Sequence, residues 1–129
     1  MNERRAAATT LELSIPADPT LALTARIFAG AVSRYLAGES PDDLKLALSE
    51  LLAGAIEAGA TEVAFRVDVD RQEVSAQGAG AGVTGLGGAE EDDERRVART
   101  SRAALLSALF PGMRTEGDIV ILPLRGSSA

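Results

Sequence analysis

The amino-acid sequence predicts an α+β fold, a two-layer sandwich in which three helices cover one face of a mixed, mostly antiparallel sheet. Several segments alternate apolar and polar residues with the period of two that is typical of strands. Longer segments between them place apolar residues at the three- and four-residue steps of amphipathic helices. The length of 129 residues suits one domain around one core. We expect that domain to span residues 10–125, with a disordered tail at residues 1–9 and a second tail at residues 126–129.

The first predicted elements are a strand and a helix. Residues 11–15 alternate apolar and polar side chains, which indicates a strand. Asp18 followed by Pro19 is typical of an N-cap and a first helical position. Apolar residues then recur at helical spacing as far as Ala37, and Gly38 follows as a stop signal. We therefore expect a helix from Pro19 to about Ala37.

A second helix and a hairpin follow. Ser40 is an N-cap candidate with acids in the turn after it, and the apolar face of residues 41–58 ends before Gly59. Residues 63–69 alternate apolar and polar side chains, which predicts a strand with one solvated face. After a short turn, residues 73–77 predict an antiparallel return strand.

The last third of the chain predicts a loop, a helix and a strand. Residues 78–88 contain six glycines, a density that disfavours helix and strand, so we expect a flexible loop. Acidic residues 90–94 precede a helix that ends at Pro111, and this placement of charge suits the helix dipole. Residues 118–124 are apolar at nearly every position, which predicts a central strand buried on both faces. Four arginines of that helix are expected to form a solvated face or to meet an acidic partner: Arg95, Arg96, Arg99 and Arg102.

The composition excludes several classes of function. The chain has no cysteine and no histidine, which removes disulfides, thiolate metal sites and every mechanism that uses an imidazole. The formal net charge of -6 argues against a nucleic-acid partner, because phosphate binding needs clustered cations. No segment approaches the roughly 20 apolar residues that span a bilayer, and we expect no secretory signal after Met1. We therefore expect a cytoplasmic protein without a membrane partner.

Two local patterns have simpler interpretations than the motifs whose letters they match. Residues 80–85 match GxGxxG as a string, but they do not open a helix within a βαβ unit. No Gly-Lys-Ser or Gly-Lys-Thr follows, so they form no P-loop. We interpret them as part of the flexible loop. The acids of residues 90–94 are interpreted as a solvated helix start rather than as a metal site.

Three segments in order resemble one known family. The helix of residues 41–58 contains Leu-Ser-Glu-Leu-Leu-Ala-Gly-Ala-Ile-Glu-Ala-Gly at positions 48–59. A glycine-rich stretch after a hairpin is the second segment, and the closing helix and apolar strand of residues 103–124 are the third. In this order the segments resemble the GHKL (Bergerat-fold) family of histidine kinase-like ATPases, and within it the small bacterial anti-sigma factor serine kinases. The resemblance covers about residues 11–124 and implies a Bergerat-like fold.

The resemblance implies that the metal site and the phosphate site are degenerate. In the family, a glutamate that matches Glu50 positions or deprotonates a nucleophile, and an asparagine one helical turn later holds magnesium. Here the asparagine position is Gly54, which offers no oxygen ligand. A glycine-rich box that binds phosphate falls on residues 100–103, which contain no glycine. Glu50 is therefore expected to remain as a vestigial acid without a partner, and Glu57 as a solvated helix charge.

The adenine-binding position is altered as well. The aspartate of the family motif DxGxG accepts a hydrogen bond from the adenine amino group. Aligning the motif on Gly78 and Gly80 puts Ala76 at the acid position, whereas aligning it on Gly80 and Gly82 puts Gly78 there. Neither register supplies a carboxylate, although Gln77 offers an acceptor.

These losses predict a non-catalytic regulatory protein, a pseudokinase that keeps the shape of an anti-sigma factor kinase. It would act through protein–protein interaction in the control of transcription or signalling. The partner that the resemblance implies is a sigma factor or an anti-sigma antagonist, bound around the first helix and the first strand. A homodimer is compatible with this interpretation. No cofactor is expected.

Two other interpretations stay open. The first is an active ATP-dependent anti-sigma serine/threonine kinase with unusual nucleotide ligands. It would need ATP, magnesium and a replacement metal ligand from Ser49, Glu50 or Glu57. The second is a degenerate phosphotransfer domain of histidine-kinase systems, which would serve only for docking because the chain has no histidine.

Overall fold

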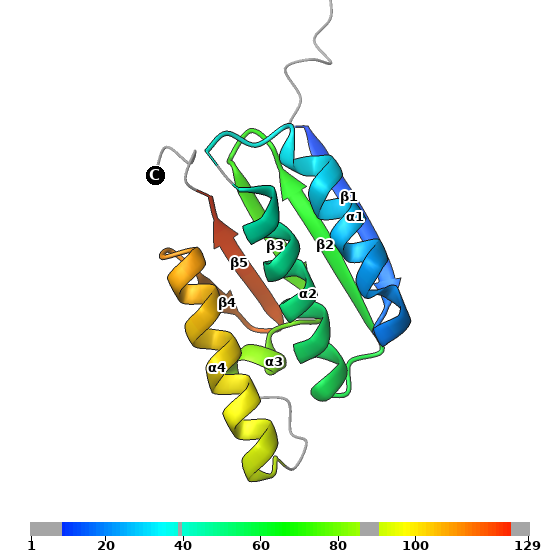
Figure 1. The fold of residues 1–129 in the computed structure, drawn as a ribbon, viewed down its shortest axis with the longest axis vertical. Helices are drawn as coiled ribbons and strands as arrows, with labels where there is room; N and C mark the ends of the chain where they lie inside the picture. Colours follow the sequence, from blue (N-terminus) through cyan, green and yellow to red (C-terminus); the bar gives the residue numbers. More distant parts are fainter. Residues whose placement is uncertain (1–8, 39, 86–90, 125–129) are drawn as a thin grey trace, which may run out of the picture.

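The chain folds into two layers, a five-stranded sheet and a layer of helices (Figure 1). The computed structural model describes residues 9–38, 40–85 and 91–124. The predicted tails, apart from Thr9, lie outside these described residues, as do residues 86–88 of the predicted loop and Glu90 of the acidic run.

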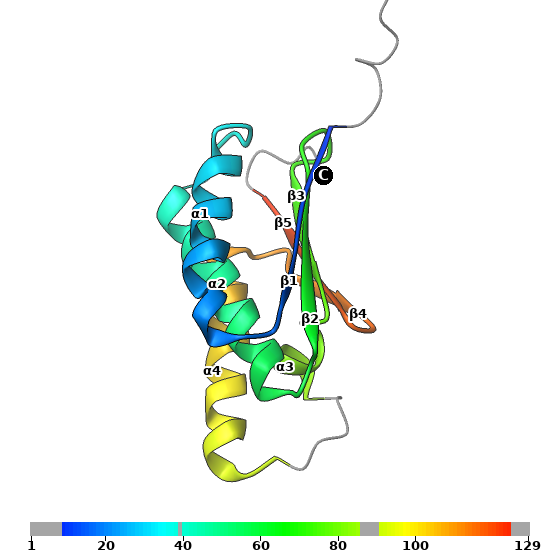
Figure 2. The ribbon, with the colours of Figure 1, turned by 90° about the vertical axis from the view of Figure 1, so that its right-hand side faces the viewer.

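The strands are β1 (Thr10–Pro16), β2 (Glu62–Asp68), β3 (Glu73–Gln77), β4 (Arg114–Glu116) and β5 (Ile119–Pro123). The helices are the 3-10 turn η2 (Pro19–Leu21) and the α-helices α1 (Ala22–Ser33), α2 (Pro41–Glu57), α3 (Ala81–Thr84) and α4 (Asp93–Leu109). Seen edge-on, the three long helices lie on one side of the sheet, and the other face of the sheet is open (Figure 2). The predicted α+β two-layer sandwich is confirmed.

The sheet has the order β1-β2-β3-β5-β4, and each of these pairings is antiparallel. The prediction of a mixed sheet is therefore wrong in that detail. The cause is the connection between β1 and β2, which consists of two helices in succession. The chain reverses three times between β1 and β2, once into each helix and once into β2, so β2 runs antiparallel to β1. Short turns make the reversals from β2 to β3 and from β4 to β5.

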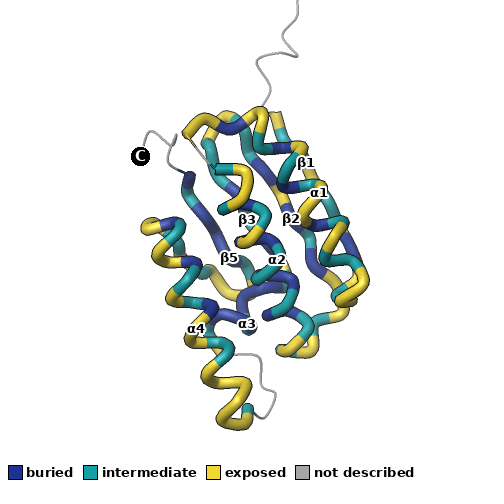
Figure 3. The backbone as a smooth tube through the Cα atoms, viewed as in Figure 1, coloured by how far each residue is buried: buried dark blue, intermediate teal, exposed yellow. Residues whose placement is uncertain are grey.

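Alternation along the strands puts one set of side chains under the helices. Val63, Phe65 and Val67 of β2 are fully buried, and the positions between them are exposed or half-buried. The buried stretches concentrate in the sheet and in α2, whereas the first turns of α4 are exposed (Figure 3). α2 supplies leucines and alanines to this core: Leu44, Ala47, Leu48, Leu51, Leu52 and Ala55. None of the described helices is long and apolar enough to cross a bilayer.

The predicted helix starts are confirmed. Asp18 caps η2, Ser40 caps α2, and Asp92, within the acidic run, caps α4. In each case a side-chain oxygen accepts a hydrogen bond from a backbone N–H of the first turn. These caps satisfy donors that the helix itself leaves without a partner.

The first helix ends earlier than predicted, at Ser33 instead of Ala37. The N–H of Tyr35 bonds to a carbonyl three residues back, which tightens the chain out of the α-helix. The N–H of Ala37 donates to the side-chain oxygen of Gln72 at 2.9 Å, in the turn between β2 and β3. Gly38 follows with a φ of 79°. A partner 35 positions away thus replaces the last helical turn, and no local pattern announces it.

The final strand, β5, lies where it was predicted, but the short strand β4 that pairs with it was missed. β5 lies between β3 and β4, and Val120, Ile121 and Leu122 are all buried. β4 has three residues and pairs with β5 after a turn at Gly117, whose φ is 60°. A strand this short contains too little alternation for a period of two to be recognised.

The glycine-rich segment contains a short helix, α3, where a flexible loop was predicted. The N–H groups of Gly78 and Gly80 both donate to the carbonyl oxygen of Asp118, at 3.0 and 3.1 Å, which ties the segment to the start of β5. Ala79 and Val83 are buried in the core. These tertiary contacts outweigh the poor helix propensity of glycine.

Candidate functional site

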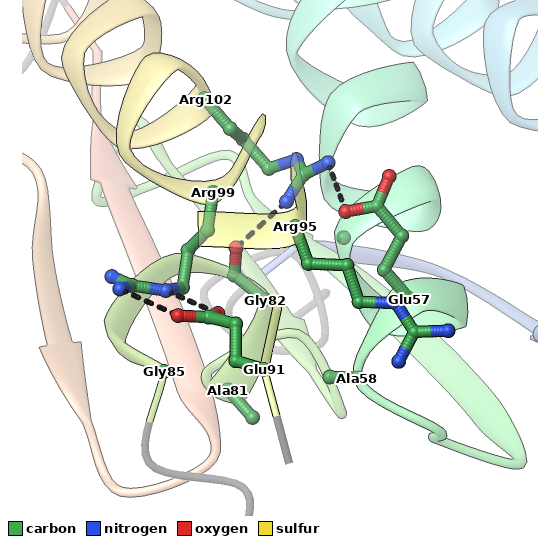
Figure 4. Close-up of a pocket in the computed structure, with 10 residues that line it drawn as sticks. Glu57, Ala58, Ala81, Gly82, Gly85, Glu91, Arg95, Arg99 and Arg102 are labelled. Atoms are coloured by element: carbon green, nitrogen blue, oxygen red, sulfur yellow. Dashed lines mark hydrogen bonds and ion pairs between the residues drawn. The ribbon is translucent and has the colours of Figure 1, made fainter. Parts of the chain in front are cut away.

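Three helices meet at one place, and each supplies a residue to a small cavity (Figure 4). Gly54 belongs to α2, Gly82 to α3 and Arg102 to α4. The cavity has a volume of about 30 Å³. The other lining residues are Glu57, Ala58, Ala81, Gly85, Glu91, Arg95 and Arg99. The cavity therefore lies at the part of α2 that the sequence marked as a degenerate metal site.

The two glycines let the three helices approach closely. A Cβ atom on Gly82 would lie 2.6 Å from the carbonyl oxygen of Gly54, so the backbone of one of the two helices would have to shift. A Cβ atom on Gly54 would lie 2.9 Å from Cδ and 3.0 Å from Nη1 of Arg102. The arginine thus fills the space that a side chain at position 54 would need.

The guanidinium of Arg102 is buried, since only 4% of the residue is exposed. Its Nη1 donates to the carbonyl oxygen of Gly82 at 2.9 Å, and its Nη2 donates to Oε1 of Glu57 at 3.0 Å. Its Nε lies 3.4 Å from Oε1 of Glu50, which is an ion-pair distance without the angles of a hydrogen bond. Two carboxylates and one carbonyl thus compensate the buried charge, which would otherwise be costly.

The structure corrects two predictions about charged residues. Arg102 was expected on a solvated or partner-facing side of its helix, and it is buried. Glu50 was expected to lack a partner, and it lies beside Arg102. Glu57 is solvent-exposed, as expected of a solvated helix charge, but it also pairs with Arg102. The two glutamates are seven positions apart, so they share one face of α2. Their side chains remain 34% and 39% exposed, so water still reaches both carboxylates.

Arg102 was named from the sequence, but its place at the candidate site was missed, although a signal was present. Arg102, Leu106 and Phe110 are spaced by four, and all three are buried. The arginine therefore falls on the apolar stripe of its helix, where a charge requires a partner. The matching signal on α2 is a glycine between two glutamates at helical spacing, which makes room for a cation and supplies its counter-charges.

A second arginine pair closes another part of the cavity wall. Arg99 donates from Nε and Nη2 to the two carboxylate oxygens of Glu91, at 2.7 and 3.0 Å (Figure 4). The hydrogen bond from Arg99 lowers the pKa of Glu91 below its ordinary value of 4.5. The same bond raises the pKa of Arg99, which keeps the guanidinium charged. This pair joins α4 to the residue just before its N-terminal cap.

The glycines of the predicted adenine box have structural roles. Gly78 has a φ of 95° and bonds to the carbonyl of Asp118, as Gly80 does. Ala76, at the acid position of one register, is fully buried in β3, and Gln77 is exposed. Among the glycines of the motif, only Gly82 lines the cavity. Neither register brings a carboxylate to this site.

The size and charge of the site limit what it can bind as folded. A cavity of about 30 Å³ has room for ordered water, whereas pockets for small molecules measure about 300–1,000 Å³. Within the described ranges, no three acidic side chains converge as a metal site. The carboxylates of Glu50 and Glu57 are positioned for a cation, and the guanidinium of Arg102 already supplies it.

Two comparisons with known proteins were negative. The scan of family models finds none that matches the chain. The search of curated proteins finds no significant match either.

The contact between Gly54 and Arg102 predicts a change of sign in a double-mutant cycle. Gly54→Ala should destabilise the protein by about 1–3 kcal/mol, because the new methyl group displaces the guanidinium from its partners. In an Arg102→Ala background the same change should stabilise it by about 0.5–1 kcal/mol, because alanine favours a helix interior over glycine. Urea unfolding of the four proteins measures the coupling. Equal effects of Gly54→Ala in both backgrounds would contradict this contact.

A pair of glycine substitutions in two helices tests the close approach at Gly82. Gly82→Ala should cost more than about 3 kcal/mol, because its Cβ meets the backbone of α2. Gly30→Ala in α1 is the matched control, since its Cβ would meet only the flexible end of Lys45, at 3.1 Å. That control should stabilise the protein by about 0.5–1 kcal/mol. Similar thermal unfolding of both variants would refute the packing described here.

The Glu91–Arg99 pair predicts a pH dependence of stability. The pKa of Glu91 is lowered in the folded state, so its contribution is complete above 4.5, its ordinary value, and is lost as the pH falls through the folded value. The wild type should therefore lose its advantage over Glu91→Gln in acid. Denaturant unfolding at neutral and acid pH gives the difference. An Arg99→Gln background is the control, because without the guanidinium the Glu91→Gln change should show no such pH dependence.

Proposed function

We propose that this chain is a non-catalytic regulatory protein that retains the fold of an anti-sigma factor kinase and acts by binding another protein. One observation carries the proposal. The guanidinium of Arg102 lies over Gly54, with Glu50 at 3.4 Å and Glu57 at 3.0 Å. If the resemblance holds, a permanent cation stands where the family binds magnesium.

The chemistry of arginine supports the loss of catalysis. A magnesium ion holds phosphates because it accepts several oxygen ligands at once and keeps exchangeable positions. The guanidinium of Arg102 donates its hydrogen bonds to Gly82 and Glu57 and lies beside Glu50. Its charge is thus neutralised by the protein itself, and little of it is available for a transferring phosphoryl group.

The geometry also supports the absence of a nucleotide. The cavity of about 30 Å³ lacks the volume for an adenosine phosphate. At the adenine end, the family aspartate is replaced by Ala76 in one register and by Gly78 in the other, and neither side chain offers an acceptor. The cost of clearing Arg102 from its partners would be added to the cost of each missing ligand. We therefore expect neither ATP nor magnesium as a cofactor.

The proposed setting is the control of transcription or signalling in the cytoplasm of a bacterium. A sigma factor or an anti-sigma antagonist is the class of partner that the resemblance implies, and a homodimer is compatible with it. Nucleic acid is a poor partner, because the chain carries a formal charge of -6 and phosphates would be repelled. Exposed apolar residues on α1, Leu23 and Ile27, support a protein-binding face on this helix.

Calorimetric titration with ATP and ADP tests the proposal. With or without magnesium, millimolar nucleotide should give no heat of binding and no rise in the melting temperature. Ligand binding to the folded state raises stability by mass action, so the thermal assay detects even weak binding. Arg102→Ala is the companion variant, and it should remain without magnesium-dependent binding because Gly54 still provides no ligand.

Magnesium-dependent binding of ATP to the wild type would overturn the proposal. It would favour the active serine/threonine kinase, in which Ser49, Glu50 or Glu57 holds the metal. Phosphoryl transfer from labelled ATP to an antagonist protein would then complete the case.

A further inference from the structure

The first helix of the sandwich has two apolar faces. Ala25, Ala29 and Val32 form the face that is buried against the core. Leu23 and Ile27 form another face, and they are 59% and 63% exposed. A surface helix of an isolated domain needs one apolar stripe. Neighbouring large apolar side chains in water are typical of a contact surface.

These two residues border a shallow groove between the outer face of α1 and the first turns of α2. The groove has a volume of about 360 Å³, more than ten times that of the cavity at Gly54. Gly30 and Ala31 line it as well, and their small side chains leave the space that forms the groove. We call this surface the α1 groove.

The charge of the α1 groove opposes that of the whole chain. Its charged lining residues are Arg26, Arg34 and Lys45, and no acid lines it. Within the part of the chain that the structure describes, none of these three cations forms an ion pair. The remainder of the chain is strongly acidic, since the formal net charge is -6. The three cations therefore face outward on an acidic protein.

We propose that the α1 groove binds an acidic amphipathic helix of a partner protein. Leu23, Ile27 and Ala31 follow one another at steps of four, so they line about 12 Å of one helix face. A partner helix with apolar side chains at the same spacing would pack against this stripe. Carboxylates on both sides of its apolar face would lie near the cations. The proposal rests on the proposed function and specifies the chemistry of its partner.

Two other occupants fit the groove less well. In a symmetric homodimer the same patch meets itself, so the positive charges of Arg26, Arg34 and Lys45 would lie against a positively charged surface and repel. A nucleic acid would satisfy the cations but leave Leu23 and Ile27 against a polar backbone. An acidic amphipathic helix satisfies the apolar and the charged residues together.

A displayed library of helical peptides tests the proposal. Peptides of about four turns, roughly 15 residues, are randomised among leucine, alanine, glutamine, glutamate and lysine. Peptides selected on the wild type should be rich in glutamate, with leucines at steps of three and four. Their affinity, measured by fluorescence anisotropy, should fall as salt is raised, because exposed charges are screened.

Two triple variants locate the binding. Arg26→Gln, Arg34→Gln and Lys45→Gln together should weaken the selected peptides by on the order of tenfold, since three exposed ion pairs are lost. Arg66→Gln, Arg71→Gln and Arg114→Gln remove the same charge away from the α1 groove. Both sets change the formal net charge from -6 to -9, so long-range attraction is matched. The second set should change the affinity by less than twofold. Leu23→Ser with Ile27→Ser should abolish binding in a protein that still unfolds cooperatively.

Several results would overturn the proposal. Selected peptides that are neutral or basic would do so, as would equal binding to the two triple variants. A wild-type dimer in sedimentation that Leu23→Ser with Ile27→Ser dissociates would show that a second copy fills the groove. An unsuccessful selection on a protein that binds no nucleotide would refute the docking proposal alone. Magnesium-dependent ATP binding would refute the proposed function, whatever the peptides do.

Discussion

The buried guanidinium of Arg102 makes the contacts on which the packing of α2, α3 and α4 depends. It joins α4 to α2 through Glu57, to α3 through the carbonyl of Gly82, and lies beside Glu50. A buried arginine is tolerated only where acceptors surround it and space is left for it. Gly54 provides that space, since any side chain there would meet the guanidinium. The glycine and the arginine therefore constrain one another, and the small volume of the cavity follows from both.

The fold was largely predictable from local patterns, because the strands alternate and the helices have clear caps. Ser40 and Asp92, for example, are N-caps whose side chains accept a hydrogen bond from the first turn of the helix. The errors arise where distant contacts decide the structure. Gln72 replaces the last turn of α1 by accepting the N–H of Ala37. In α3, glycine propensity predicts a loop, but bonds to the carbonyl of Asp118 and buried neighbours hold a helix. Neither contact leaves a trace in sequence spacing.

The candidate site was predictable in position and unpredictable in content. The resemblance drew attention to Gly54 on α2, one helical turn after Glu50, and the cavity lies beside it. It gave Glu50 no partner, however, and did not place Arg102 there. Arg102 is 48 positions beyond Gly54, and only the packing of α4 on α2 brings the two together. The lack of a side chain at Gly54 and the burial of Arg102 belong to one contact, although the two positions are far apart in the sequence.

The distribution of cations separates the two surfaces of this protein. Arg99 and Arg102 are paired with acids of their own chain, so their charges stabilise the fold and close the cavity. Arg26 and Arg34 have no partner among the described residues, and they flank apolar side chains in water. Charges that a protein neutralises internally contribute little to recognition, whereas unpaired charges beside exposed apolar groups attract a complementary surface. If the chain is regulatory, its specificity for a partner protein therefore resides on α1. The ion pairs around the cavity beside Gly54 then serve to stabilise the fold.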